Sequence, residues 1–241
     1  MRKQALVALL SLLLLAPWRG KRALTRVQEE VVLRLEDGFM QRLAHLHAGL
    51  ASLPARASGP VTWLCERHAR VSRRPAPPLP TSLHADYDTL LTGIAAHLGN
   101  AQNGISGPVS WLHGDYHAGN LLFVDTAVSG ILDFDEVGQG SPALETAFAL
   151  FALARDTRFE DRFVFDGDVW ETGLQAYASL QPDIAVDLLR VNRDALIPLF
   201  CADQVLIHLE AAQRGLWTLG PGIGFLGCWH QLLADMPTRL A

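Results

Sequence analysis

Three polar side chains with the chemistry of a catalytic site lie near one another in the middle of the chain. Asp115 and Asn120 are five positions apart in the segment WLHGDYHAGNLLF, and Asp133 follows in the segment SGILDFDE. Carboxylate and amide oxygens are hard ligands of the kind that Mg²⁺ takes, usually alongside the phosphates of a substrate. A carboxylate beside such an ion can accept the proton of an attacking hydroxyl group. These residue types therefore indicate a metal site with a carboxylate base next to it.

The local sequence predicts how these side chains are brought together. Short apolar runs at Leu121–Val124 and Gly130–Leu132 are typical of strands, and turn-forming residues lie between them. Because the two strands of a hairpin run antiparallel, the start of one and the end of the other lie at the same edge. We therefore expect Asn120 and Asp133 to face one another, with Asp115 near the metal without binding it. The alternative for all three residues is a role as ordinary turn formers.

The loop before this hairpin contains two histidines and two glycines. His113 and Gly114 suit a backbone that must be bent and held, and Gly119 allows a close approach or a positive φ beside Asn120. We expect His113 and His117 to fix the loop by hydrogen bonds to the backbone. Neither histidine is assigned as a catalyst or as a zinc ligand.

Most of the remaining chain has the apolar periodicity of helices, with apolar residues at every third or fourth position. Ser141 followed by Pro142 is typical of a helix start. Helical or apolar segments are expected at residues 27–50, 61–71, 82–98 (closed by Gly99-Asn100) and 143–154, with three or four more helices from about Gly167, broken near Pro182, Pro198 and Gly220-Pro221. A further short strand is expected at Val109–Leu112. The predicted fold class is mostly α with a small β hairpin.

The composition is that of an ordinary globular protein. The 241 residues carry a formal net charge of −5 and are 49% hydrophobic, so the chain has material for a core and lacks the basic surface that nucleic acid requires. Cys65, Cys201 and Cys228 are widely spaced and form no C-x-x-C pair, so the pattern suggests neither a disulfide framework nor a zinc site. We expect reduced, mostly buried thiols in a cytoplasmic protein, with no membrane span.

The first 24 residues differ from the rest of the chain. A basic start precedes an apolar run from Ala5 to Ala16, which is typical of a signal peptide and too short to cross a bilayer, where ~20 residues are needed. A buried helix and a misassigned start of a longer gene are the alternatives. We divide the chain into an apolar N-terminal segment, residues 1–24, and a main domain, residues 25–241. The protein is expected in the cytoplasm unless residues 1–16 direct export.

The pattern H-G-D-x-x-x-x-N followed by I-L-D-F-D resembles the catalytic loop and metal motif of the aminoglycoside phosphotransferase and choline kinase superfamily. That superfamily shares the protein-kinase-like fold, whose matching motifs are H-R-D-x-x-x-x-N and D-F-G. The resemblance implies that Asp115 is the catalytic base and that Asn120 and Asp133 bind Mg²⁺, with ATP as the nucleotide. The segment Gly38–Ala48, which ends in a leucine-histidine pair, resembles the helix before the family's substrate lobe. The resemblance covers residues 38–240, the C-terminal lobe of that fold.

The chain departs from the family pattern at two places. Ser141 and Glu145 stand where family members commonly have aspartates, in the segment GSPALETA. The residues before Gly38 contain neither a glycine-rich loop nor a V-A-x-K strand, and Lys21 does not match the lysine that pairs with the nucleotide. We therefore expect the N-terminal nucleotide lobe to be missing or reduced, and no nucleotide-binding residue is assigned.

The resemblance implies an ATP- and Mg²⁺-dependent phosphotransferase that acts on a hydroxyl group of a small molecule. The departures leave three possibilities open: a truncated phosphotransferase, a minimal kinase that holds ATP by its metal and C-terminal lobe alone, or a non-catalytic kinase-like binding protein. A secreted hydrolase that uses His113 or His117 with Asp115 is a further alternative, but the chain lacks the G-x-S-x-G pattern of a nucleophilic serine.

These motifs do not specify the acceptor. Acidic residues after the metal motif would suit a cationic acceptor, and a solvated charged loop explains them as well; they are Glu160, Asp161, Asp166, Asp168 and Glu171. Trp170, Trp217 and Trp229 are expected to fill the core rather than to stack on a ligand.

Overall fold

The computed structural model describes residues 26–56, 59–105, 107–125, 127–155, 163–181, 189–190, 192–219 and 223–234. Several expectations fall outside these ranges: those for residues 1–24 and Lys21, for the breaks at Pro182 and Gly220-Pro221, and for Glu160 and Asp161.

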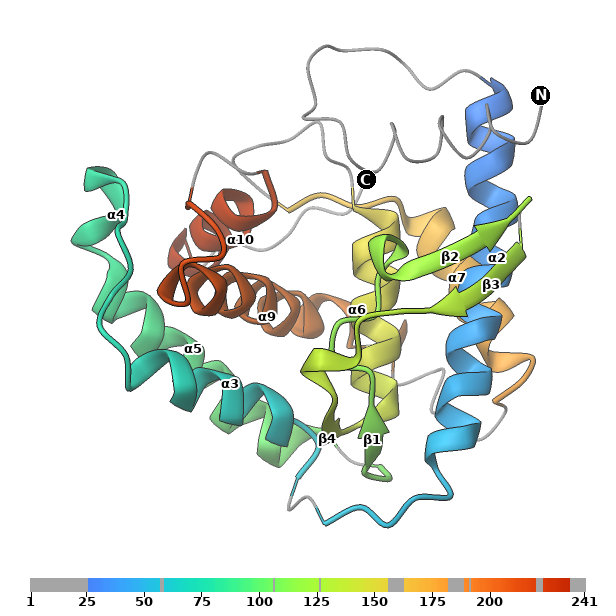
Figure 1. Ribbon diagram of the computed structural model, residues 1–241, viewed down its shortest axis with the longest axis horizontal. Helices are drawn as coiled ribbons and strands as arrows, with labels where there is room; N and C mark the ends of the chain where they lie inside the picture. The colour runs from blue at the N-terminus through green and yellow to red at the C-terminus, as the bar shows by residue number, and fades with distance from the viewer. Residues whose placement is uncertain are drawn as a thin grey trace.

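Helices make up most of the described chain, which confirms the predicted fold class (Figure 1). They are α2 (Arg26–Leu50), α3 (Thr62–Ser72), α4 (Thr81–His84), α5 (Tyr87–Gly104), α6 (Pro142–Ala154), α7 (Gly167–Ala178), α9 (Arg193–Gln213) and α10 (Ile223–Ala234). Ser141 caps α6 as expected, because its side chain accepts a hydrogen bond from the backbone N–H of Leu144.

Two helix boundaries differ from the prediction. The expected helix 82–98 is two helices, and α5 continues past Gly99-Asn100 to Gly104, where burial of Ala101 outweighs the weak helix propensity of glycine. The expected break at Pro198 was wrong, because this residue lies inside α9. It sits in the second turn, so the lost backbone hydrogen bond is near the helix start, and its neighbours Ile197 and Leu199 are buried.

Two small antiparallel sheets carry the polar loop. β2 (Leu121–Val124) pairs with β3 (Ala127–Ile131), so the predicted hairpin is confirmed, although β3 starts three residues before the expected Gly130. β1 (Ser110–Leu112) also agrees with expectation, and it pairs with β4 (Gly138–Gly140), a strand that the sequence did not predict. Two glycines in a three-residue strand give no apolar alternation, which explains the omission.

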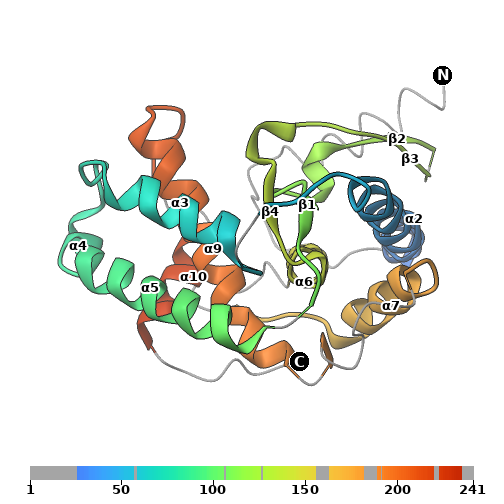
Figure 2. The ribbon, with the colours of Figure 1, turned by 90° about the horizontal axis from the view of Figure 1, so that it is seen from below.

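The helices form two groups on either side of these sheets. α3, α4, α5, α9 and α10 lie together on one side, α2 and α7 lie on the other, and α6 stands between them beside β1 (Figures 1 and 2). The loop that carries Asp115 follows β1, so it lies where the two helical groups meet.

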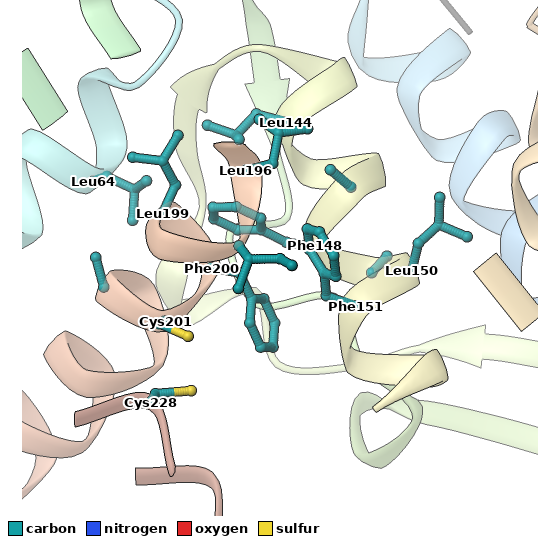
Figure 3. Packing of buried hydrophobic residues seen from close by; sticks show 14 of the residues in the cluster. Leu64, Leu144, Phe148, Leu150, Phe151, Leu196, Leu199, Phe200, Cys201 and Cys228 are labelled. Carbon is teal, nitrogen blue, oxygen red and sulfur yellow. The ribbon is translucent and has the colours of Figure 1, made fainter. Parts of the chain in front are cut away.

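The core is built around α6, which is apolar on almost every face. Phe148 and Phe151 of α6 pack against Phe200 of α9, with ring centroids 5.7 and 5.6 Å apart (Figure 3). Cys201 and Cys228 are free, buried thiols beside this cluster, as expected, while Cys65 is half-buried. Of the described helices, only α9 has the length and composition to cross a membrane, and 67% of its apolar window is buried within the protein, as in a core helix.

Leu150→Ala should lower the free energy of unfolding by ~2–5 kcal/mol, because the side chain is fully buried on α6 and its removal leaves a cavity. Leu216→Ala is the matched control, since Leu216 is 62% exposed, and it should change stability by less than about 0.5 kcal/mol. Denaturant unfolding followed by circular dichroism measures both values. Similar losses for the two variants would contradict the central position of α6.

Candidate active site

The loop after β1 has a backbone conformation that requires glycine. Gly114 has φ +84°, and a Cβ atom at this position would overlap the carbonyl oxygen of Glu136. The expected bend therefore lies at Gly114. Gly119 does not have a positive φ. A Cβ atom added at this position would collide with the ring of His117, so glycine is needed here for the close approach of that ring.

A buried carboxylate on α6 fixes this loop in place. Glu145 accepts hydrogen bonds from the backbone N–H groups of His113 (3.2 Å) and Gly114 (2.6 Å). His47 of α2 lies 2.8 Å from the same carboxylate through Nε2, and its Nδ1 lies 2.6 Å from the Tyr177 hydroxyl of α7. Three helices therefore converge on one carboxylate that holds two consecutive loop amides.

Sequence reasoning did not find this role for Glu145. Two signals were present: Glu145 stands at a family aspartate, and the leucine-histidine pair in Gly38–Ala48 contains His47. His47 and Glu145 are 98 residues apart in the sequence, and no local pattern links them. Their contact results from the packing of α2 against α6.

His113 has the structural role that was expected. Its side chain is fully buried, and Nε2 lies 2.8 Å from the carbonyl oxygen of Leu132, to which it donates. Nδ1 then accepts the backbone N–H of Asp115 at 3.3 Å. The imidazole thus ties the Asp115 loop to the end of the hairpin.

Asp115 is held by Asn120 and His117. The Asn120 amide nitrogen donates to the Asp115 backbone oxygen at 2.9 Å and to Oδ2 at 3.2 Å, and Nε2 of His117 lies 3.4 Å from Oδ2. Burial raises the pKa of Asp115, but His117, the charge of Arg67 and the Asn120 hydrogen bond together outweigh burial, so the pKa lies below its usual value. The carboxylate is therefore ionised and oriented near neutral pH.

The hairpin brings Asn120 and Asp133 to the same edge, as the sequence predicted. Leu121 pairs with Ile131, and the backbone N–H of Leu132 donates to the Asn120 carbonyl at 2.8 Å. Asp133 follows directly, exposed and in the left-handed conformation with φ +59°.

The donor atoms at this edge fit a hydrated Mg²⁺ ion. The Asn120 amide nitrogen faces Asp115, so its Oδ1 is left for an ion, and the exposed Asp133 supplies a carboxylate. Across the described residues there is no group of three or more His, Cys, Asp or Glu that could hold a metal alone. Mg²⁺ in proteins is usually bound by one or two protein side chains, with phosphates and water completing its coordination. Two ligands, Asn120 and Asp133, are therefore sufficient.

A buried ion pair joins the segment after Asp133 to the helices. Arg67 of α3 is buried and bonds both Asp203 of α9 and, at 2.7 Å, Glu136. Glu136 is therefore paired and not simply solvated, although the sequence around it, DFDE, is typical of an exposed acidic turn. Burial raises the pKa of Asp203 to about 7, although Arg67 opposes the shift.

Asp115 opens into a cavity of about 340 Å³ between the two helical groups. The wall combines aromatic side chains with polar and charged ones. Trp63, Phe148, Phe200 and Trp217 are among the aromatic residues, and Asp115, His117, Glu145, Arg155, Asp203 and His208 are among the polar and charged residues. Trp217 is 50% exposed at this wall, so its expected place in the core was wrong, whereas Trp170 and Trp229 are buried as expected.

Comparison with known proteins identifies the class to which this fold and loop belong. The profile of the phosphotransferase enzyme family matches residues 6–182, so the chain belongs to that family. The resemblance to aminoglycoside phosphotransferases and the kinase-like fold are thereby confirmed. A sequence search of characterised proteins finds no match.

Solved structures with the same fold are kinases of small molecules. An amicoumacin kinase, hAmiN, in complex with AMP-PNP, Ca²⁺ and Ami superposes with TM-score 0.59 at 13% identity, covering 93% of this chain and 65% of that one. A choline/ethanolamine kinase family protein from Mesorhizobium loti gives 0.54 at 15%, covering 86% and 64%. The gentamicin complex of APH(2″)-IIa gives 0.52 at 14%, covering 90% and 68%. The chain thus spans about two thirds of the length of these kinases.

Glu145→Gln should lower the free energy of unfolding by ~1–3 kcal/mol, because an NH₂ group replaces one of the two buried oxygens that accept from His47 and the two loop amides, and a buried donor is left unpaired. Glu171→Gln is the matched control, since Glu171 pairs with Arg190 at the surface, and it should cost less than about 1 kcal/mol. Denaturant unfolding at neutral pH measures both. Equal effects of the two substitutions would refute the anchoring role of Glu145.

Asp115→Asn should lower the pKa of His117. Burial lowers that pKa, but the hydrogen bond and charge of Asp115, with the charge of Asp133, raise it above its ordinary value of 6.5. The stability that His117 contributes is thus fully present below its unfolded pKa and is lost as the pH rises through the higher folded pKa. Proton NMR titration of the imidazole C2–H measures the shift, and Asp125→Asn, at the far end of the hairpin, should leave it unchanged.

Proposed function

We propose that this chain carries the transfer site of a kinase that moves the γ-phosphoryl group of ATP, with Mg²⁺, to a hydroxyl group of a small molecule. The observation that carries the proposal is the contact of Asp115 with Asn120 at 3.2 Å, at the edge where the hairpin also brings Asp133. Membership of the phosphotransferase family supports it.

Asp115 has the role of catalytic base. Its ionised carboxylate faces the cavity and accepts the proton of the acceptor hydroxyl, which orients the attacking oxygen. A pKa below the usual value makes Asp115 a weak base. A weak base is sufficient, because the transition state of phosphoryl transfer is loose and depends mainly on positioning and electrostatics.

Asn120 and Asp133 would hold the Mg²⁺ ion at the end of the hairpin. When bound, the ion neutralises the charge on the phosphate oxygens. His117 keeps the Asp115 carboxylate in position, because its Nδ1 accepts the backbone N–H of Gly119 while Nε2 lies beside Asp115 Oδ2. It is a positioning residue in this scheme.

The surface beside Asp133 suits the flat, apolar faces of a nucleotide base. Leu122, Leu132 and Phe134 flank the metal edge and are 49%, 45% and 46% exposed. Exposed apolar side chains near Asp133 would give such a base an apolar contact surface.

Mg-ATP should bind the chain in isothermal titration calorimetry, and binding should require Mg²⁺. Asp133→Asn should abolish this metal dependence, because it removes a charged ligand. Asp125→Asn is a matched control, since Asp125 also has a left-handed φ, +56° against +59°, and lies in the turn at the far end of the hairpin. Absence of Mg-dependent binding, or equal loss in both variants, would contradict the metal site.

Asp115→Asn should retain Mg-ATP binding while the rate of transfer falls by ~10²–10⁴-fold, the usual contribution of a general base. Formation of ADP with a panel of small hydroxyl compounds measures the transfer. An unchanged rate would exclude Asp115 as the base. Mg-ATP binding without any transfer would favour the alternative, a kinase-like binding protein.

A further inference from the structure

The cavity next to Asp115 contains a guanidinium group, that of Arg155, which no described residue neutralises. Arg155 ends α6 and lines this cavity. Its Nε is buried, and the described part of the chain gives the side chain neither a hydrogen bond nor an ion pair. A buried N–H group without an acceptor is unfavourable, so a ligand that supplies anionic oxygens would relieve it.

Apart from Asp115, the proposed base, the carboxylates that the described wall contributes are already bound by other groups of the protein. Asp203 bonds Arg67, and Glu145 bonds His47 and two backbone amides. Within the described wall, a cationic acceptor would find no unengaged carboxylate other than Asp115, which the hydroxyl requires. The charges of the wall therefore favour an anion over a cation.

The rest of the wall suits a flat, apolar body. Trp217 lies at the edge of the cavity with its ring 5.1 Å from that of His208, and it is half exposed. Burial lowers the pKa of His208 and the charge of Arg155 lowers it further, so this ring is neutral near pH 7. A neutral imidazole and an indole together offer a stacking surface without a second charge.

Two of the acidic residues that suggested a cationic acceptor, Asp166 and Glu171, have other partners. Asp166 caps α7 by accepting the backbone N–H groups of Asp168 and Val169, and Glu171 pairs with Arg190 and Gln175. Of the described acidic residues, Asp166, Asp168 and Glu171 do not line the cavity.

We infer that the acceptor is a hydroxyl compound with an aromatic or similarly flat body and an anionic group, carboxylate or phosphate, that pairs with Arg155. This inference rests on the proposed function, because it assumes that the hydroxyl is presented to Asp115. It excludes polycations such as aminoglycosides as the preferred substrates of this cavity.

Three probes that share a ring and a primary alcohol test the inference. They are 4-(hydroxymethyl)benzoate, 4-(hydroxymethyl)phenylphosphonate and 4-(hydroxymethyl)benzylamine, titrated into the full chain without nucleotide and followed by ligand-observed NMR. At least one anionic probe should bind roughly tenfold more tightly than the amine, the scale of one charge-assisted hydrogen bond. The tighter of the two anions identifies which group the site takes, and added salt should weaken the preference.

Arg155→Gln should abolish the preference for the anionic probes, and Arg155→Lys should retain part of it. Arg214→Gln is the matched control, because Arg214 also ends a helix, α9, but does not line this cavity. Circular dichroism establishes that each variant is folded, and the salt dependence of the unsubstituted chain tests the charge preference without any substitution.

The inference is overturned if the amine binds as tightly as the anions, if neither anion binds at millimolar concentration, or if folded Arg155→Gln keeps the preference. Mg-ATP titration of the same samples separates this outcome from failure of the proposed function. Intact Mg-ATP binding with no preference for anions refutes only the acceptor class, whereas absence of Mg-ATP binding with the preference intact refutes the kinase and leaves only an anion-binding site at Arg155.

Discussion

The geometry of the candidate site depends on one buried carboxylate. Glu145 binds two consecutive amides of the loop that carries Asp115 and is itself held by His47, which in turn contacts Tyr177. Because these groups belong to α6, α2 and α7, the loop cannot shift unless the packing of three helices changes. Charged groups are costly to bury unless they are paired and hydrogen-bonded, so the network also fixes how those helices approach one another.

A second buried ion pair extends this control to the other helical group. Arg67 of α3 reaches both Glu136, just after the metal motif, and Asp203 of α9. The Glu145 network holds the Asp115 loop from one side, and Arg67 holds the segment after Asp133 from the other. The two loops also meet directly, since Gly114 packs against the Glu136 carbonyl.

Features that depend on local sequence patterns could be predicted, namely the strands of the hairpin and the residues at its edge. Alternation of apolar runs and turn residues marked β2 and β3, and the hairpin register then placed Asn120 and Asp133 at one edge. The sequence could not reveal Glu145 or Arg67 as anchors, because their partners lie up to 136 residues away and no periodicity links them. Trp217 was misplaced for a related reason: composition alone cannot distinguish a tryptophan in the core from one at the edge of a cavity.

These anchors explain how the site sustains an unfavourable backbone. Asp133 is a non-glycine residue with φ +59°, and such a conformation costs about 1–3 kcal/mol. His113 bonds the neighbouring Leu132 carbonyl from inside the protein, while the Arg67–Glu136 pair holds the chain on the other side of Asp133. Because the chain is held at Leu132 and at Glu136, the backbone of Asp133 between them cannot relax to a more favourable φ. The Asp133 carboxylate therefore points outward at the edge of the hairpin. The contacts that hold this segment thus lie on either side of Asp133, and Asp133, which would bind the ion, is itself exposed.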